Sequence, residues 1–592
     1  MSLLDVNGLT ISYAALPEPV VDRLDLSMER GEALGLVGES GAGKTQTALA
    51  IMGLLTPHAT VQGQVLFDGF ALAGQTAKVL NRFRARRLAM VFQDPKQALN
   101  PYLPIGEQLK RVLLEHRIVD RRAARGRALE LLRRVRLPDA ERQYRSYPHQ
   151  LSGGMRQRAM IALALACEPE LLIADEPTTA LDVTVQAQVL KLLKELRAQT
   201  GIGLLLITHD LGVVAENCER MLVMHRGRLL EQGSTRTVFR TPRQQITKEM
   251  LAAAARLDHR PPERPPVSAL PVLLVDRISV RFREAPSGWK RQGSRGVVGN
   301  VSFSLAPGET LGIVGESGCG KTSLARALVG LVAADTGSVC LSAEPLAARV
   351  ADRAPEERRD LQMVFQDPVA SLSPAMKVGS IIAEPVALHE PGLRRDERND
   401  RVASALGRAG LDPSLLQRFP HELSGGQAQR VAISRALVLQ PKVLICDEAV
   451  AALDGTVRRA ILDLLAAEQR RSGLSLVFIT HDLAVVRQIS DRVLVMYMGG
   501  IAELADNENL FARPRHPYTR ALLDAVPQAD PERVPPALPI EGEVSTEGRP
   551  SGCPFHPRCA YAVARCREEV PALRQVDGVE VACHRAEELD LR

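Results

Sequence analysis

The chain has 592 residues, 45% of them hydrophobic, which is enough for roughly four domain-sized units and several buried cores. Its 75 basic residues nearly balance 69 acidic ones, and a net charge of +6 gives little support for a nucleic-acid-binding or membrane-surface role. No stretch approaches the roughly 18 apolar residues of a membrane-spanning helix, and the start lacks the regions of a signal peptide, which predicts a cytoplasmic chain.

The first motif is a glycine-rich turn between a predicted strand and a predicted helix. The apolar run EALGLVGE leads into GESGAGKT, and the helix-like TALAIMGLL follows. In such a turn, backbone N–H groups face phosphates at the positive end of the helix, a lysine adds charge, and a hydroxyl holds Mg²⁺. A chance glycine-rich turn is the alternative, but the flanking strand and helix favour a phosphate site. The predicted ATP-binding residues here are Gly38, Ser40, Gly41, Gly43, Lys44 and Thr45.

Two later apolar strands end in residues suited to phosphoryl transfer. LLIADE ends at Asp175 and Glu176, and GLLLIT is followed by His209. We expect Asp175 to reach the Mg²⁺ shell, Glu176 to polarise the attacking water, and His209 to contact the γ-phosphate and position that water. A lone carboxylate or histidine would more often be structural. The alternation of strands and helices predicts a three-layer α/β core.

The chain then repeats itself. GESGCGKT returns at residue 315, and three further motifs recur at a shared offset of 272 residues. Such registration indicates duplication of a whole domain, and the spacing of 33 residues from Glu to His in both copies favours a site over a structural pair. In the second copy the predicted ATP-binding residues are Gly315, Ser317, Gly318, Gly320, Lys321 and Thr322, with Asp447 on Mg²⁺ and Glu448 and His481 as catalytic residues.

These patterns divide the chain into four parts. We expect a first nucleotide-binding domain over 1–255, a Pro/Arg-rich linker over 256–270, a second nucleotide-binding domain over 271–526 and a cysteine-bearing extension over 527–592.

The combination of motifs resembles the nucleotide-binding domains of ABC transporters. The specific element is the signature, LSGGM in the first copy and LSGGQ in the second, each 23 residues before the strand-end aspartate when counted from its serine. The resemblance implies tandem P-loop NTPase domains that close head to tail within the chain, so that the signature of one half covers the ATP of the other. The residues that it implies at ATP are Ser152, Gly153, Gly154, Ser424, Gly425, Gly426, Asp182 and Asp454.

Further positions follow from the same resemblance. Gln93 and Gln366 match the loop glutamine that touches Mg²⁺ and lies beside the membrane subunit. An aromatic before each P-loop stacks on adenine, which assigns Tyr13 and Phe282, although an ordinary core aromatic is a fair alternative for Phe282. Met155 replaces the usual glutamine of the signature, a mild change, and we expect both sites to be competent.

Other stretches resemble the dipeptide, oligopeptide and nickel importer subfamily, namely QDPKQALNP, QDPVASLSP, RHPYTRALLDAVP and the cysteine tail. The subfamily implies two integral-membrane permease subunits, an extracytoplasmic binding protein that selects the cargo, and a peripheral place on the cytoplasmic face of the bacterial inner membrane. Peptides are the expected cargo, with nickel complexes or glutathione as alternatives. Twin-cassette ATPases that act on ribosomes or DNA, and exporters, are the rival classes.

The tail contains Cys553, Cys559, Cys566 and Cys583. A cytosolic place argues against disulfides, and four thiols in about 30 residues suit a metal centre, with zinc and iron–sulfur both open on chemistry alone. The resemblance of the extension to an iron–sulfur module favours a [4Fe–4S] cluster. His556 and His584 are nearby, and supporting or surface roles suit them better than ligation.

Overall fold

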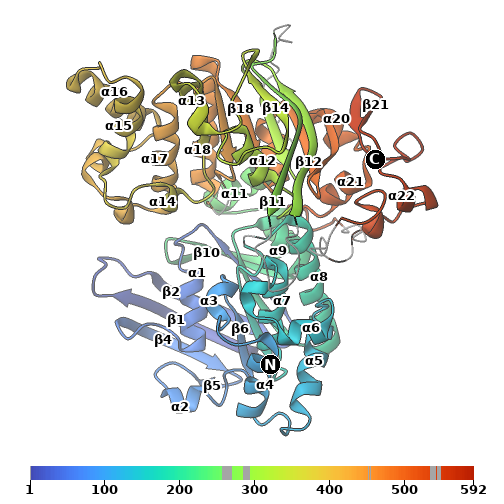
Figure 1. Ribbon diagram of the computed structural model, residues 1–592. Coiled ribbons are helices and arrows are strands. Elements are labelled where there is room, and N and C mark those ends of the chain that lie inside the picture. Colours follow the sequence, from blue (N-terminus) through green and yellow to red (C-terminus); the bar gives the residue numbers. More distant parts are fainter. Residues whose placement is uncertain are drawn as a thin grey trace. The chain divides into compact units, whose positions relative to one another are not determined.

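The computed structural model describes residues 2–179, 181–255, 270–283, 294–450, 453, 455–533, 540, 542 and 549–591. The chain divides into two compact units, one of residues 1–256 with 525–538 and one of residues 257–524 with 539–592. Each unit combines sheets with helices, which confirms the predicted α/β class (Figure 1).

The first unit contains two sheets. Its strands are β1 (Ser2–Tyr13), β2 (Val21–Glu29), β3 (Ala33–Gly38), β4 (Ala59–Phe67), β5 (Phe70–Ala71), β6 (Leu88–Val91), β7 (Leu171–Asp175), β8 (Gly203–Thr208), β9 (Arg220–His225) and β10 (Arg228–Ser234). The larger sheet has the order β10-β9-β3-β8-β7-β6 and is parallel except for β10, whereas β2-β1-β4-β5 is antiparallel. Strands β3, β7 and β8 are buried along their whole length, as expected for parallel strands with both faces covered.

Helices pack against both faces of the larger sheet. They are α1 (Lys44–Met52), α2 (Ala77–Leu80), α3 (Pro95–Ala98), α4 (Ile105–Glu115), α5 (Ala124–Arg134), α6 (Ala140–Arg145), α7 (Gly153–Ala164), α8 (Val183–Thr200), α9 (Leu211–Asn217), α10 (Thr235–Arg240) and α11 (Gln245–Ala255). One apolar core joins the sheet to α1 and the antiparallel sheet, and a second joins its other face to α4, α5, α7, α8 and α9. Alternate residues of β3 serve the two cores, because successive side chains of a strand point to opposite faces.

The second unit repeats this plan. Its strands are β11 (Leu273–Arg283), β12 (Ser294–Leu305), β13 (Thr310–Val314), β14 (Thr336–Leu341), β15 (Glu344–Pro345), β16 (Leu361–Val364), β17 (Val443–Asp447), β18 (Ser475–Ile479), β19 (Arg492–Tyr497), β20 (Gly500–Asp506), β21 (Arg574–Val576) and β22 (Val579–Val581). Its helices are α12 (Lys321–Leu328), α13 (Pro355–Asp360), α14 (Pro368–Ser371), α15 (Val378–His389), α16 (Arg395–Arg408), α17 (Gly425–Leu437), α18 (Gly455–Ser472), α19 (Leu483–Ile489), α20 (Asn507–Ala512), α21 (Pro517–Asp524) and α22 (Ala564–Glu568).

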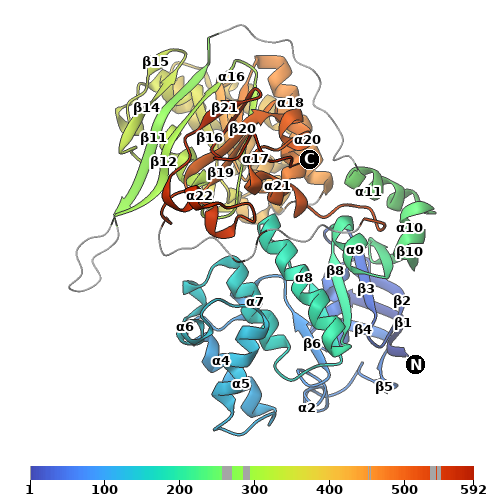
Figure 2. The same ribbon diagram turned by 90° about the vertical axis from the view of Figure 1, so that its right-hand side faces the viewer.

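The C-terminal extension is part of the second unit's sheet. The order β16-β17-β18-β13-β19-β20-β22-β21 places the hairpin of β21 and β22 beyond β20. Figure 2 labels β21 close to β20. Residues 549–591 therefore share a unit with the second repeat, and within the described residues the predicted small cysteine-rich module is not shown.

Residues 525–533 belong instead to the first unit, where they pack on α9. Glu216 at the end of α9 accepts a hydrogen bond from the backbone of Gln528 at 3.1 Å and lies 3.3 Å from the Arg533 guanidinium. A Cβ atom on Gly212 would lie 2.8 Å from the carbonyl group of Pro527, so the close approach of the segment requires glycine there. The chain thus passes from one unit to the other after Asp524.

Candidate functional site

The first glycine-rich turn joins the end of β3 to the start of α1. Gly43 precedes the helix with a φ of +96°, in the left-handed region. A Cβ atom there would lie 2.7 Å from the Val20 carbonyl oxygen, so a larger residue would be strained and would clash. The glycine lets the backbone turn sharply into the N-terminus of α1, where N–H groups can face an anion.

Lys44 is the first residue of α1 and spans the turn. Its Nζ donates to the carbonyl oxygens of Gly38 at 2.7 Å and Glu39 at 2.9 Å, and the residue is 5% exposed. Burial lowers the pKa of Lys44, while the carboxylates of Glu176 and Asp175 act in the opposite direction. The ammonium group therefore lies at the position where a phosphate-binding charge is required.

Asp175 ends β7 beside Thr45. The Thr45 Oγ1 donates to Asp175 Oδ1 at 3.3 Å, and Asp175 is 2% exposed. Burial raises the pKa of Asp175 to about 6, although the Thr45 hydrogen bond lowers it. A hydroxyl and a carboxylate side by side are the hard oxygen ligands that Mg²⁺ prefers, so these two residues fit a magnesium ion.

Glu176 receives three polar side chains. It accepts hydrogen bonds from Gln93 Nε2 at 2.7 Å and Thr179 Oγ1 at 2.9 Å, and His209 Nδ1 lies 3.3 Å away. Burial alone would raise the pKa of Glu176, but His209 and Thr179 hold it at about 2, so the carboxylate is ionised at neutral pH. The structure thus brings together Gln93, Glu176 and His209, which come from three separate segments.

The second unit repeats this geometry around its own glycine-rich turn. Lys321 Nζ donates to the carbonyl oxygens of Gly315 at 2.7 Å and Glu316 at 3.1 Å. Thr322 Oγ1 donates to Asp447 Oδ1 at 3.2 Å, and burial raises the pKa of Asp447. This second pair of oxygen ligands likewise fits Mg²⁺.

The second carboxylate is held in the same way. Gln366 Nε2 donates to Glu448 at 2.6 Å, and His481 Nδ1 lies 3.5 Å from that carboxylate. Burial would raise the pKa of Glu448, but His481 and Lys321 lower it. Both units therefore present an ionised carboxylate next to a glutamine and a histidine.

The signature serines begin helices. Ser152 Oγ accepts from the Met155 backbone at 3.1 Å, and Ser424 Oγ accepts from the Gln427 backbone at 3.3 Å. In the second helix the cap is reciprocal, because Gln427 Oε1 accepts a hydrogen bond from the Ser424 N–H at 3.0 Å. The matching residue of the first helix is Met155, whose side chain has no oxygen to accept such a bond. The first signature helix therefore lacks the reciprocal half of this cap.

The other predicted nucleotide contacts lie in different settings. Asp182 is 9% exposed and directly precedes α8, whereas Asp454 lies outside the described residues. Tyr13 donates its hydroxyl to Gln46 Oε1 at 2.7 Å, which places its ring beside the start of α1. Phe282 lies on β11 with 44% exposure, just before residues that the structure does not describe.

Sequence reasoning missed contacts to the second turn. The Glu316 N–H donates to the Tyr518 hydroxyl at 3.0 Å, and the Glu316 carboxylate pairs with Arg558. Tyr518 belongs to the motif RHPYTRALLDAVP, which indicated a subfamily but not a contact, and nothing in the sequence pattern singled out Arg558.

The predicted metal centre at the four cysteines is not supported. Within the described parts of the chain, no group of three or more His, Cys, Asp and Glu side chains is placed to hold a metal ion. Burial raises the pKa of Cys559 and Cys583 to about 11, while backbone hydrogen bonds at Tyr561 and Arg585 act in the opposite direction. Contacts that involve no metal hold the extension, including the pairing of β22 with β20.

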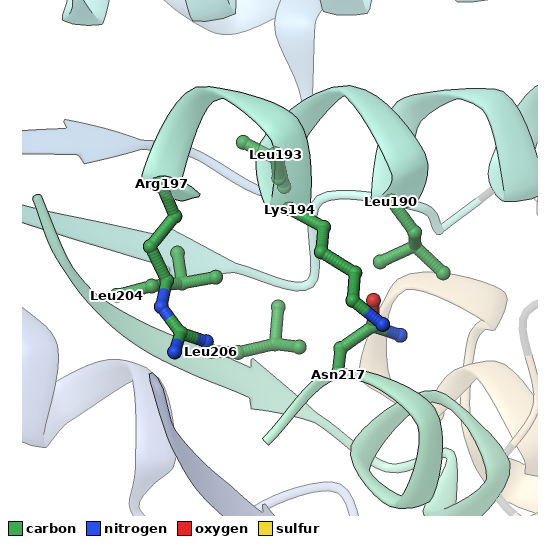
Figure 3. A pocket seen from close by; sticks show the side chains of 7 residues that line it. All are labelled: Leu190, Leu193, Lys194, Arg197, Leu204, Leu206 and Asn217. Carbon is green, nitrogen blue, oxygen red and sulfur yellow. The ribbon is translucent and has the colours of Figure 1, made fainter. Parts of the chain in front are cut away.

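A small recess elsewhere in the first unit is unrelated to these residues. It lies between α8, β8 and the end of α9, and Figure 3 shows leucine side chains from both α8 and β8 beside the polar side chains of Lys194, Arg197 and Asn217. Its lining consists of Leu190, Leu193, Lys194, Arg197, Leu204, Leu206 and Asn217. It contains none of the predicted site residues.

Comparison with known proteins identifies both repeats and the extension. The sequence model of the ABC transporter family matches residues 21–179 and 298–451, and that of the oligopeptide/dipeptide transporter C-terminal region matches residues 502–566. The chain is 46% identical to the glutathione import ATP-binding protein GsiA of Pectobacterium atrosepticum over 565 residues, covering 90% of each chain. The protein of the same name from Salmonella choleraesuis is 44% identical over 565 residues, again covering 90% of each chain.

Among solved structures, a dimeric ATP-binding cassette bound to ADP and phosphate is 26% identical, with a TM-score of 0.36. The match covers 40% of this chain and 98% of the chain in that structure. Among the helices that the structure describes, none has the length and apolar character needed to span a bilayer.

Proposed function

The chain belongs to the ABC transporters, as an ATPase subunit with two ABC domains and an oligopeptide/dipeptide transporter C-terminal region, and on this premise we propose that it drives the import of glutathione. The observation that supports this cargo is the identity of 46% to a glutathione import ATP-binding protein over 90% of both chains. The expectation of peptides in general is replaced by this alternative, which is itself a tripeptide. The relatives give no support to nickel complexes, and the importer-type C-terminal region argues against ribosome or DNA work.

In the proposed mechanism each P-loop binds the triphosphate of ATP. The backbone N–H groups after Gly38 and Gly315 and the ammonium groups of Lys44 and Lys321 contact the β- and γ-phosphates. This requires each lysine to exchange its present carbonyl partners for phosphate oxygens.

Magnesium would be held by the hydroxyl and carboxylate pairs. Thr45 with Asp175, and Thr322 with Asp447, fit the ion. The resemblance to ABC transporters adds Gln93 and Gln366, which donate to the neighbouring carboxylates of Glu176 and Glu448. When bound, the ion neutralises charge on the β- and γ-phosphate oxygens.

Hydrolysis is assigned to the two carboxylate and histidine pairs. Ionised Glu176 and Glu448 polarise the attacking water, and His209 and His481 orient it against the γ-phosphate. The carboxylates suit this role because their depressed pKa keeps them able to accept a hydrogen bond from water at neutral pH.

We further propose that the halves close head to tail on two ATP molecules. Ser152, Gly153 and Gly154 would then cover the second P-loop's ATP, and the matching residues 424–426 the first. Two permease subunits and an extracytoplasmic binding protein complete the importer at the cytoplasmic face of the bacterial inner membrane, with no nucleic acid involved. The ATPase itself need not read the cargo.

Reconstituted transport tests the cargo. The chain, with the permeases that co-purify with it and the cognate binding protein, is placed in vesicles, and uptake of radiolabelled glutathione is compared with that of a dipeptide and a pentapeptide. ATP-dependent glutathione uptake supports the proposal. ATP-dependent uptake of the other peptides without glutathione uptake contradicts it, while leaving the ATPase function intact.

A further inference from the structure

The second P-loop is tied to the C-terminal extension by a buried ion pair. The Arg558 guanidinium donates to both carboxylate oxygens of Glu316, at 2.6 and 2.9 Å, and these side chains are 8% and 4% exposed. Glu316 follows Gly315 at the start of the loop, whereas Arg558 ends a short turn of the extension, 242 positions later. Two-point contact of this kind fixes the carboxylate in orientation as well as position.

An aromatic cluster fixes the turn that carries Arg558. Tyr518 is fully buried, and its ring centroid lies 4.6 Å from that of Tyr497 and 5.4 Å from that of Phe555. Phe555 is only three residues before Arg558, so its packing positions the guanidinium. Tyr518 also accepts the Glu316 N–H at 3.0 Å.

Glu316 is therefore held at three points. Its N–H is bonded to Tyr518, its carboxylate to Arg558, and its carbonyl oxygen to Lys321 Nζ at 3.1 Å. The backbone at Glu316 is the first part of the phosphate loop, and Lys321 is the residue that would contact phosphate. Contacts from the extension thus bear directly on the geometry of the loop.

The glutamate of the first P-loop has a different ion-pair partner and a more exposed side chain. The matching Glu39 side chain is 44% exposed and lies 3.7 Å from His225 Nδ1. Ile246 stands where Tyr518 stands in the second repeat and offers no hydroxyl. This match is secure because Glu231 and Glu503 accept from backbone N–H groups at equivalent positions.

The ion pair matters because a buried carboxylate needs a partner. Without the guanidinium, Glu316 would lose the buried positive charge that offsets its own, close to a loop that must receive a polyanionic triphosphate. The loop would then shift or repel phosphate, and either change weakens nucleotide binding. The first loop would be unaffected.

On the premise that the chain binds ATP at both loops, we propose that Arg558 is a positioning residue for the second ATP site. It neutralises Glu316 and holds that loop in its phosphate-binding form. Through this contact the C-terminal extension sets nucleotide affinity at the second site and not at the first.

Photolabelling of the full-length chain with 8-azido-ATP tests the inference, with mass mapping of the labelled peptides reporting each half separately. In Arg558→Met, the 8-azido-ATP concentration that gives half-maximal labelling of the second half should rise about tenfold, while that for the first half should not change. The matched control is Arg565→Met, which removes an equal charge from the same extension at an exposed pair with Glu569. It should label as the wild type does.

Unchanged second-half labelling in folded Arg558→Met overturns the inference. If that variant does not fold, Arg558→Lys replaces it, since lysine keeps the charge but not the two-point contact, and second-half binding should weaken about threefold. The pair of changes Glu316→Gln and Arg558→Met removes both charges and should recover most of the labelling lost in Arg558→Met. No recovery, or no effect of the lysine variant, contradicts the inference, and a wild type unlabelled in both halves overturns the ATP-binding premise as well.

Discussion

The side-chain amide of Gln93 donates a hydrogen bond to the Glu176 carboxylate at 2.7 Å. By the resemblance to ABC transporters, this glutamine lies in the loop that meets the membrane subunit. The residue expected to sense the permease therefore touches the residue expected to polarise water. A shift of this loop would therefore alter the hydrogen bond from Gln93 to Glu176 directly, with no intervening residue.

We expect Glu176→Gln and Glu448→Gln each to lower steady-state ATP hydrolysis, because the amide cannot accept a proton from water. The double variant should lose at least about 100-fold, in line with the usual contribution of a general base. A colorimetric phosphate assay measures the rates. Glu195→Gln, which changes a half-buried partner of Arg136 outside the site, is the control. An unchanged rate in either single variant would show that its site is idle.

Tyr13→Ala should weaken ATP binding in the first half by about 1–3 kcal/mol, because the ring that stacks on adenine is lost. Tyr13→Phe keeps the ring and loses only the hydrogen bond to Gln46, so it should bind nearly as the wild type does. Titration with a fluorescent ATP analogue measures both. Equal losses in the two variants would assign the effect to the hydroxyl and reject stacking.

Gly212→Ala should loosen residues 525–533 from α9, since the new Cβ would lie 2.8 Å from the Pro527 carbonyl group. Tryptic cleavage after Arg533 should then be faster, because proteases attack locally released segments. Gly126→Ala makes the same change in α5, where a Cβ meets nothing within 4 Å, and should cleave at the wild-type rate. Equal rates in all three proteins would contradict the packing.

The second unit should lose stability in acid through His516. Burial lowers the pKa of this histidine to about 4 from 6.5, although a backbone contact at Ala582 acts in the opposite direction. The folded state keeps the ring neutral, so the contribution is complete above pH 6.5 and falls as the pH drops towards 4, by about 3 kcal/mol.

Urea unfolding of the wild type and of His516→Asn at pH 7 and pH 4.5 measures this effect. The variant should be less stable at pH 7, and the gap between the two proteins should narrow at pH 4.5. A constant gap would mean that the histidine does not titrate on unfolding.

Much of the site could be anticipated from sequence because its determinants are local. The pattern around Lys44 fixes a turn and a helix start, and Asp175 ends a buried strand, so both could be assigned to one sheet edge. The duplication then gave the same expectation for the second half. The α/β class and the ABC resemblance were confirmed on this basis.

Other features could not be read from the chain. The Arg558 and Glu316 pair joins residues 242 positions apart, and no periodicity links them. Cysteine spacing suggested a metal centre, but spacing along the chain does not fix how four thiols lie in the fold, and the described residues contain no group placed to hold a metal ion. The packing of residues 525–533 on α9 likewise depends on Gly212, which has no distinguishing local pattern.

The hairpin of β21 and β22 covers part of the edge of β20, at Glu503 and Leu504. An edge strand with unpaired N–H and C=O groups is a template for strands of other molecules, and β22 occupies that position along β20. A chain truncated before Arg574 would uncover this ladder, so shortened forms of the protein should form intermolecular sheets and precipitate even when both ATP-binding domains are complete.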